Sequence, residues 1–382
     1  MLKRTPLYAA HQRLGARLIE FGGWEMPVQY AGIVEEHRAV REAAGLFDIA
    51  HMGEIAVSGP GAEAFLNHTL TNDVRRLGVG SGQYTLLCNA AGGVVDDLYA
   101  YRVKADEFLL IVNASRIEAD WDWLQTQVEG CPTPDGFRIH NASQELGALA
   151  IQGPRVAEFM DRTIAGGSIG GVVVPSVTGL KKNEVAVFVF RGISVWVART
   201  GYTGEDGFEV VAPAEALPAL WEAILEVGSG CGLRPAGLGA RDTLRTEMGY
   251  PLYGHELNET TTPVEAGLSV FVGWEKERFV GREILVRQRA EGVRRRCVAF
   301  RMTDRSAPPR PHYPICAGPE GAPIGEVSSG TQSPSLGVGI GMGYVPVEYS
   351  RVDTPLMIEI RGRRAPAVVV RKPLYRRASK AG

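Results

Sequence analysis

Two adjacent aspartates, Asp96 and Asp97, lie inside the apolar segment GGVVDDL, residues 92–98. Successive side chains of a β-strand point to opposite faces, so if one carboxylate is solvated the other faces the core or a cleft. Burying a carboxylate is costly unless it is paired or takes part in chemistry. The segment therefore indicates either a strand-end aspartate that caps a turn or a carboxylate used in binding or catalysis.

Aromatic and amide side chains lie close to these carboxylates in the predicted strands. Tyr99 and Tyr101 follow Asp97 on the same strand face, Tyr84 lies on the preceding strand, and Asn113 lies on the following strand. Three neighbouring strands thus offer tyrosine, aspartate and asparagine, which suit a flat heteroaromatic ligand.

A glycine-rich run, RTGYTGEDGFE over residues 199–209, places a ring and carboxylates beside flexible backbone. Its glycines are Gly201, Gly204 and Gly207, and its other candidates are Tyr202, Glu205, Asp206 and Glu209. The glycines are expected to let the backbone approach a ligand. A carboxylate accepts two parallel N–H bonds from an amidine-like edge, as in a pterin or guanine. For Glu205 and Asp206, a tight acidic hairpin is the stronger alternative.

Two arginines, Arg241 and Arg245, share one face of a helix predicted over residues 240–249. The guanidinium fork suits recognition of a carboxylate. The alternative is a charge ladder on a solvated helix.

The segments FGGWEMP (residues 21–27) and HMGE (residues 51–54, with Met52) combine aromatic, sulfur-bearing and small residues. Such residues can form a ligand wall, although each is more often part of a core.

The elements that must position these residues are a mixture of helices and mainly antiparallel strands. Strands around residues 83–89, 94–103 and 108–115 are joined by spacers too short for a crossover helix, so they form consecutive hairpins. The apolar spacing also predicts helices over 7–20, 31–45, 60–70, 115–128, 214–228 and 240–249, and strands over 46–57, 146–152 and 185–198. From about residue 278, short β runs separated by Pro and Gly predict a barrel or sandwich of about 90 residues. The glycine-rich GVGIGMG at 337–343 lacks phosphate-loop spacing and is read as a strand with close backbone approach.

Composition excludes several protein classes. The chain has 382 residues, 41 basic and 43 acidic side chains, and 47 glycines. The balanced charge argues against nucleic-acid binding, and no apolar run is long enough to cross a membrane. Five scattered cysteines without a CxxC pair, and no visible secretory signal, favour a cytoplasmic protein. No P-loop, zincin or α/β-hydrolase motif is present.

Taken together, these segments resemble the glycine cleavage T-protein family, whose members are aminomethyltransferases. The matching segments occur in order from residue 4 to residue 377 and include GLFDIAHMGE, TNDV, GGVVDDL, RTGYTGEDGFE, PAGLGARDTLR, LYGHEL, TTPVEAGL, GEVSSGTQSPSLG, MGYVP and KPLYR. The resemblance implies an α+β fold, a three-domain cloverleaf of mainly antiparallel sheets with flanking helices, a C-terminal β-barrel and a central folate pocket. It also implies domains of residues 1–50 plus 140–235, 51–139 plus 236–275, and 280–377.

The resemblance further implies a reaction and its residues. The methylene of an aminomethyl group on the lipoyl arm of H-protein would pass to tetrahydrofolate, giving 5,10-methylenetetrahydrofolate and ammonia. Asp97 would be the catalytic residue, and no metal is implied. The folate contacts would be Met52, Tyr84, Tyr99, Tyr101, Ile111, Asn113, Tyr202, Glu209 and Arg241.

Other proteins of the same architecture leave two alternatives. One is a tetrahydrofolate-dependent demethylase of a small methylated substrate, and the other is a non-catalytic folate-binding accessory protein. The expected location is the cytoplasm, or the mitochondrial matrix for a mature eukaryotic chain.

Overall fold

A seven-stranded sheet forms the first lobe of the structure, a computed structural model that describes residues 2–130 and 136–377. The strand order is β10-β11-β12-β13-β9-β3-β14, and only the β3–β14 pair is parallel. The strands are β3 (Ala44–Asp48), β9 (Leu146–Gln152), β10 (Gly170–Gly171), β11 (Val185–Phe190), β12 (Ile193–Ala198), β13 (Gly207–Pro213) and β14 (Leu233–Pro235). Strand β3 near the N-terminus therefore pairs with β9 and β14, which lie far along the chain from it.

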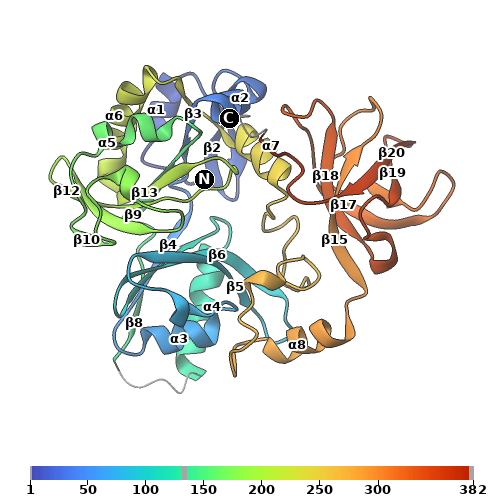
Figure 1. Cartoon of the computed structure of the whole chain (residues 1–382), viewed down its shortest axis with the longest axis horizontal. Helices are drawn as coiled ribbons and strands as arrows, with labels where there is room; N and C mark the ends of the chain where they lie inside the picture. Colours follow the sequence, from blue (N-terminus) through green and yellow to red (C-terminus); the bar gives the residue numbers. More distant parts are fainter. Residues whose placement is uncertain (1, 131–135, 378–382) are drawn as a thin grey trace, which may run out of the picture.

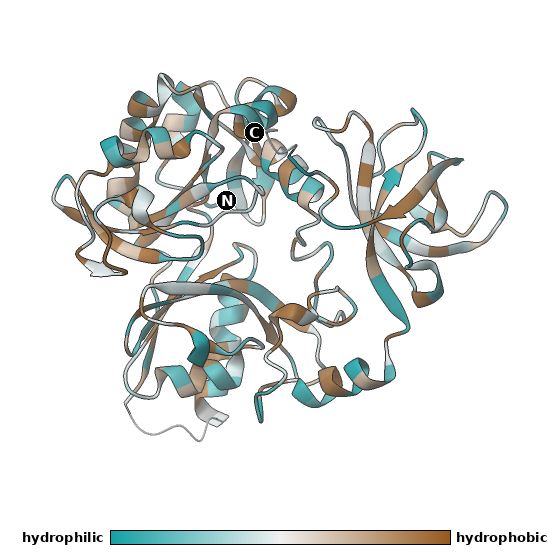
Figure 2. Ribbon diagram, in the orientation of Figure 1, coloured by the Kyte–Doolittle hydropathy of each residue, from teal (hydrophilic) through white to brown (hydrophobic). Residues whose placement is uncertain are grey.

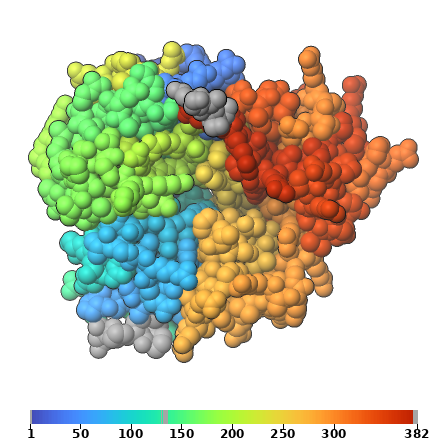
Figure 3. Space-filling model, viewed as in Figure 1, coloured from blue at the N-terminus to red at the C-terminus, as the bar shows by residue number. Residues whose placement is uncertain are grey.

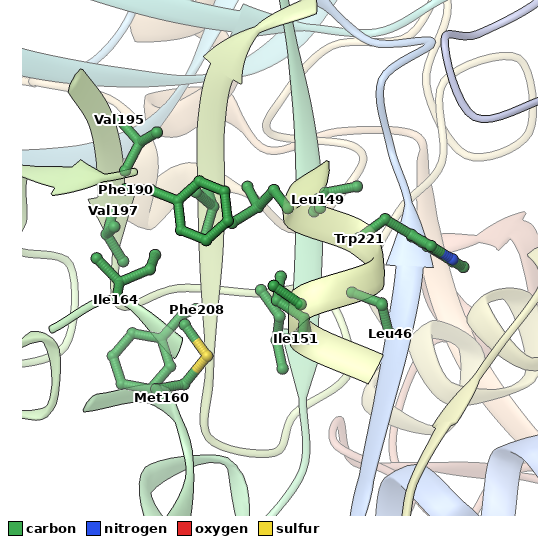
Figure 4. Packing of buried hydrophobic residues seen from close by; sticks show 14 of the residues in the cluster. Leu46, Leu149, Ile151, Met160, Ile164, Phe190, Val195, Val197, Phe208 and Trp221 are labelled. Carbon is green, nitrogen blue, oxygen red and sulfur yellow. The ribbon is translucent and has the colours of Figure 1, made fainter. Parts of the chain in front are cut away.

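Helices pack on one face of this sheet. They are α1 (Tyr8–Arg13), α5 (Met160–Thr163) and α6 (Leu217–Ser229). Figure 4 shows part of the core that results, with Leu46, Ile151 and Phe208 on the strands and Met160 and Trp221 on the helices. Burial of these apolar side chains is the main stabilisation of the lobe.

A five-stranded antiparallel sheet forms the second lobe, with strand order β5-β6-β7-β4-β8. The strands are β4 (Gly53–Ser58), β5 (Ser81–Cys88), β6 (Val94–Lys104), β7 (Glu107–Val112) and β8 (Arg138–Asn141). The predicted run of consecutive hairpin strands is confirmed in β5, β6 and β7. Helices α3 (Ala62–Thr69) and α4 (Ile117–Gly130) cover one face, where Phe65 and Leu124 belong to the same core as Ile55 and Val57.

The remaining faces of the two sheets pack against each other. The shared apolar layer contains Tyr101, Leu109 and Ile111 of the five-stranded sheet and Ala148, Ala150 and Val211 of the seven-stranded sheet. Helix α7 (Leu238–Met248) adds Ala240 and Leu244 to this layer. Residues from three distant parts of the chain thus meet around one layer.

A closed six-stranded barrel forms the third lobe, with strand order β15-β18-β17-β16-β19-β20. Its strands are β15 (Arg295–Met302), β16 (Pro314–Cys316), β17 (Pro323–Gln332), β18 (Gly339–Pro346), β19 (Pro355–Ile360) and β20 (Arg363–Val370), and α8 (Arg282–Glu291) precedes it. The GVGIGMG segment enters β18 as predicted, and a Cβ at Gly341 would lie 2.6 Å from the Phe300 ring. Apolar residues, brown in Figure 2, gather on strands of all three lobes.

The lobes surround a central region (Figure 1), and on the face in Figure 3 the surface is hollowed where they meet. The connecting elements are a hairpin of β1 (Arg17–Phe21) and β2 (Trp24–Gln29), helix α2 (Ile33–Glu42), and 3₁₀ helices at Val74–Arg76, Val156–Glu158, Val177–Gly179, Ala214–Ala216, Ser269–Phe271 and Val347–Tyr349. None of the helices in residues 2–130 and 136–377 has the length and apolar character needed to cross a membrane.

Three predicted elements are wrong in extent. The helix expected over residues 7–20 ends at Arg13, because Gly15 has a φ of +68° and the chain then forms β1. The strand expected over residues 46–57 is two strands, β3 and β4, which belong to different sheets. These two segments have apolar spacing that fits either outcome, so the tertiary contacts decide between them. The strand expected over residues 185–198 is the antiparallel hairpin of β11 and β12, whose turn lies at Arg191 and Gly192, both with positive φ.

The α+β fold class, with mainly antiparallel sheets and a C-terminal barrel, is confirmed. We propose that the domains follow the sheets, as residues 1–50 plus 140–235, 51–139 plus 236–275, and 280–377. The strands of the three sheets fall within these ranges, except that β8 of the five-stranded sheet crosses the boundary between residues 139 and 140.

Candidate functional site

Most of the predicted site residues lie on one face of the five-stranded sheet, as the strand register shows. Tyr84 of β5 pairs with Tyr99 of β6, and Tyr99 in turn pairs with Ile111 of β7. Ile111 pairs with Glu54 of β4. Cross-strand partners have Cβ atoms about 5 Å apart on the same face, so these side chains form one row. Asp97 precedes Tyr99 by two residues and therefore shares this face.

The Asp97 carboxylate is held by residues of both neighbouring strands. Its Oδ2 accepts a hydrogen bond of 2.8 Å from the Tyr84 hydroxyl, and its Oδ1 accepts one of 3.0 Å from Nδ2 of Asn113. Burial and the charge of the adjacent Asp96 raise the pKa of Asp97 to about 7, although these hydrogen bonds act against the rise. A carboxyl group with this pKa can take up and release a proton at neutral pH.

Asp96 lies on the opposite face of β6, as strand alternation predicts. It is fully buried and accepts hydrogen bonds from the backbone N–H of Asn113 at 3.0 Å and from its Nδ2 at 2.9 Å. The Asn113 amide therefore contacts both aspartates of the motif. The Asp96–Asp97 pair is thus part of a hydrogen-bonded site and not a simple turn cap.

Tyr99 and Tyr101 pack with their ring centres 4.8 Å apart. A Cβ at Gly82 would lie 2.4 Å from the Tyr101 ring and 2.7 Å from the Tyr99 ring, so a glycine is required opposite them. Tyr101 and Ile111 are buried in the layer between the sheets, whereas Tyr99 is half-buried. Tyr101 and Ile111 therefore mainly pack between the two sheets, and the Tyr99 ring is the more accessible of the three.

Arg241 of α7 lies close to predicted site residues that are outside the row on the five-stranded sheet. Its Cζ lies 4.7 Å from the centre of the Tyr202 ring, and its Nη2 lies 4.0 Å from the Met52 sulfur. Burial lowers the pKa of Arg241, and the nearby Tyr202 and Glu209 act against this. Burial also raises the pKa of Glu209, whereas the charge of Arg241 lowers it. Arg241 and Glu209 thus bring opposite charges to the side of the site that faces the sheet of Asp97.

The glycines of RTGYTGEDGFE do not have the role predicted for them. A Cβ at Gly201 or Gly207 would clash with the Gln152 side chain, at 1.8 Å and 2.3 Å, and one at Gly204 would lie 2.3 Å from the Met248 sulfur. Close approach is required here by packing against the protein itself, and the expectation of room for a ligand is wrong at these positions.

The acidic residues of the same run also serve structure. The Glu205 carboxylate pairs with Arg41 at 2.9 Å and with Arg377 at 3.0 Å, and Asp206 pairs with Arg199 at 2.6 Å. For Glu205 and Asp206 the structure therefore favours the alternative of a tight acidic hairpin over contact with a ligand.

Arg245 does not share the environment of Arg241. It is 2% exposed, and its guanidinium donates to Glu256 at 3.0 Å and to the Ser329 hydroxyl of β17 at 2.7 Å. A buried guanidinium with partners in its own chain is typical of an ion pair that joins elements. Arg245 therefore joins α7 to the barrel and is not available for a substrate carboxylate.

Glu54 was not among the predicted site residues, although it lies in the row of Tyr84, Tyr99 and Ile111. Its side chain is fully buried, and neither carboxylate oxygen has a hydrogen-bond partner among the described residues. Burial raises the pKa of Glu54 to about 8. The sequence contained a sign that Glu54 is buried, because this glutamate of HMGE directly precedes an apolar run that enters a core.

Glu54→Gln is expected to stabilise the protein at alkaline pH. The folded-state pKa of about 8 lies above the ordinary 4.5, so this group's contribution to stability is present below pH 4.5 and is lost as the pH rises to 8. Glutamine does not titrate and avoids this loss, so the expected gain at pH 8 is on the order of 4 kcal/mol. Thermal unfolding of both proteins between pH 4.5 and 8 measures the gain.

The matched control is Glu118→Gln, since Glu118 is 85% exposed. Its effect on the unfolding midpoint should be small at every pH. A constant difference between wild type and Glu54→Gln across this pH range would show that Glu54 is already ionised in the folded protein.

The sequence matches two known families of domains. Residues 7–276 match the GCVT N-terminal domain, and residues 295–376 match the glycine cleavage T-protein C-terminal barrel domain. The first match contains the seven-stranded and five-stranded sheets, and the second contains the closed barrel.

Full-length relatives agree with these matches. The chain is 45% identical over 381 residues to an aminomethyltransferase of Desulfitobacterium hafniense, with 98% of this chain and 99% of that protein covered. It is 47% identical over 382 residues to an aminomethyltransferase of Bacillus cereus, with 99% of each covered. The crystal structure of glycine cleavage system aminomethyltransferase T from Bartonella henselae superposes with a TM-score of 0.88 at 33% identity, covering 98% of both chains. The chain therefore belongs to the glycine cleavage T-protein family of aminomethyltransferases.

Proposed function

We propose that this aminomethyltransferase binds tetrahydrofolate against the sheet face of Asp97 and accepts its substrate from the lipoyl arm of H-protein. The observation that carries the proposal is the Asp97 carboxyl, held at 2.8 Å by Tyr84 and at 3.0 Å by Asn113, with a pKa of about 7. A chain of this family with such a group has an acid–base residue suited to nitrogen chemistry at neutral pH.

The residues around Asp97 suit the two ends of a folate. The Glu209 carboxylate can accept paired N–H bonds from a pterin edge. Tyr99 and Tyr202 offer aromatic surfaces, and the guanidinium of Arg241 can bind a carboxylate or carbonyl oxygen. Met52 and Asn113 complete the proposed contacts, with Tyr84, Tyr101 and Ile111 behind them.

The proposed reaction moves one carbon and two protons. The aminomethyl carbon loses ammonia, is attacked by N5 of tetrahydrofolate, and closes onto N10 as the lipoyl sulfur leaves. The two protons released from N5 and N10 end on ammonia and on the lipoyl thiol. Asp97 as a carboxylate orients these nitrogens, stabilises positive charge on them and can carry one of the protons.

The decisive test is turnover of aminomethylated H-protein with tetrahydrofolate. Release of ammonia together with 5,10-methylenetetrahydrofolate is the expected result. Inactivity there, combined with demethylation of a sulfonium or methoxy compound, would favour the demethylase alternative. Folate binding without either activity would favour the accessory protein. The cytoplasmic location stays a prediction.

Arg241→Ala is expected to weaken tetrahydrofolate binding by roughly 30-fold, which is about 2 kcal/mol for a buried arginine contact. Calorimetric titration measures the dissociation constant directly. Arg234→Ala is the control, because Arg234 lies just before α7, is 53% exposed and pairs with Glu35. An unchanged dissociation constant in Arg241→Ala would remove Arg241 from the proposed folate site.

A further inference from the structure

A second pair of carboxyl groups lies behind Asp97, on the other face of β6. Asp96 of β6 and Asp120 of α4 are both fully buried. Neither is a predicted substrate contact, since Asp96 faces the helix layer. Two buried carboxyl groups in contact are strongly unfavourable when both are ionised, so such a pair holds one proton.

The proton lies on Asp120. Neither Asp120 oxygen has an N–H or O–H donor among the described residues. Burial, the charge of Asp96 and the adjacent Asp96 carboxylate raise the pKa of Asp120 to about 11, so Asp120 is the member of the pair that keeps the proton. Asp96 also accepts two hydrogen bonds from Asn113, which favour its ionised form. The pair is therefore a carboxylic acid on α4 and a carboxylate on β6.

Asn113 connects this pair to Asp97. Its Nδ2 donates to Asp96 Oδ1 at 2.9 Å and to Asp97 Oδ1 at 3.0 Å. Its backbone N–H donates to Asp96 Oδ2 at 3.0 Å. Because Asp96 holds Asn113 at two atoms, the position of the amide beside Asp97 depends on Asp96.

The charges around the pair leave its negative charge largely uncompensated. Arg116 at the start of α4 lowers the pKa of Asp120, but its Nη2 pairs with Glu259 at 2.7 Å. Tyr253 is the remaining titratable group beside Arg116, with its ring 4.7 Å from Arg116 Cζ. On the other side, in the part of the chain that the structure describes, the titratable groups facing Asp97 are Tyr84 and Tyr202, and burial raises the pKa of both so that they are neutral at pH 7.

We propose that Asp96 and Asp120 are positioning residues, whose single shared charge holds the Asn113 amide in place and acts on the neighbouring Asp97 carboxyl. This inference rests on the proposed role of Asp97 in aminomethyl transfer. It assigns a function to the first aspartate of GGVVDDL and to a helix residue outside the motif. In this arrangement Asp120 acts as a hydrogen-bond donor and does not itself change protonation state.

Three variants separate the charge from the hydrogen bond. Asp96→Asn removes the charge and keeps the size and one acceptor oxygen. Asp120→Asn keeps a donor to Asp96, because an amide N–H replaces the acid O–H. Asp120→Leu removes the donor, which favours protonation of Asp96 and so also removes the charge beside Asp97.

The readouts are the pH profile of kcat and an infrared titration of the carboxyl C=O band, assigned to Asp97 by its absence in Asp97→Asn. In Asp96→Asn and Asp120→Leu both midpoints should move to lower pH, by about one unit or more. In Asp120→Asn both midpoints should match those of the wild type. A merely structural role would lower kcat without moving either midpoint.

The inference is overturned if the midpoints of Asp96→Asn stay at the wild-type pH, or if Asp120→Asn shifts them as far as Asp120→Leu. If Asp120→Leu does not fold, Asp96→Asn and Asp120→Asn decide the outcome by themselves. The infrared titration needs no turnover, so it tests the charge pair even if the wild type fails to transfer aminomethyl groups.

Discussion

Asp97→Asn is expected to keep the fold and to lose aminomethyl transfer by about a hundredfold to ten-thousandfold, the usual range for a positioned acid or base. Asparagine has nearly the same size, and its single amide oxygen can still accept one of the two hydrogen bonds that Tyr84 and Asn113 donate to Asp97. It has no negative charge and does not exchange a proton at neutral pH. The rate of methylenetetrahydrofolate formation with aminomethylated H-protein measures the loss, and circular dichroism checks the fold.

A control for this variant comes from the acidic run near the site. Asp206→Asn removes a carboxylate that pairs with Arg199 at 2.6 Å and is 41% exposed, so its turnover should stay near that of the wild type. Near wild-type turnover of Asp97→Asn with lipoylated H-protein would show that the role given to Asp97 is wrong. Asp97→Ala should lose activity at least as strongly, because it also leaves the Tyr84 hydroxyl without its acceptor.

Glu247→Gln is expected to lower the free energy of unfolding by about 3–5 kcal/mol, as when a buried ion pair loses one partner. Glu247 is fully buried in α7, and its Oε2 accepts from Nη2 of Arg41 in α2 at 2.8 Å. Its carboxylate also accepts from the Ser333 hydroxyl, and from the Ser335 N–H and hydroxyl at 3.1 and 2.9 Å. Since both serines belong to the β17–β18 connection of the barrel, the variant should loosen the barrel from α2 and α7.

The pH dependence of this loss has a definite sign. Burial acts against ionisation of Glu247, but His37, Ser333 and Arg41 outweigh it and lower the pKa to about 2. A folded-state pKa below the ordinary 4.5 contributes stability that is present above pH 4.5 and is lost as the pH falls toward 2. The difference between the two proteins should therefore shrink in acid.

Denaturant unfolding at pH 7 measures the effect, and Glu222→Gln is the control. Glu222 pairs with Arg13 on the surface, where the two side chains are 58% and 62% exposed, so its loss should be below about 1 kcal/mol. Equal stability of the two variants at pH 7 would show that the Glu247 network does not stabilise the fold.

Local patterns were enough to predict part of the site. The alternation of side chains and the short spacers of residues 83–113 determine both the hairpin order and the shared face of Asp97, Tyr99 and Tyr101. Tyr84 and Asn113 follow from the same reasoning, because neighbouring hairpin strands must bring their side chains level. The barrel could likewise be expected from short, evenly spaced β runs.

Other assignments failed because they depend on what lies across the fold. Gly201 and Gly207 are glycines because Gln152 occupies the space beside them. Arg245 resembles Arg241 in helical spacing, yet Glu256 and Ser329 surround it in the structure. Glu54 and Asp120 gain their raised pKa values from burial, which depends on the sheet and helix packed over them.

The sequence by itself determined the family, the α+β class and the strand face of Asp97, because ordered motifs and a period of two residues are local properties. Only the tertiary structure decided that Asn113 connects Asp97 to Asp96, that Asp120 from α4 lies behind them, and that Arg241 of α7 lies beside Met52 and Tyr202. The physical reason is that charge and hydrogen bonding in a buried site depend on distance in space, and spacing along the chain does not set the distance between elements that meet only after folding.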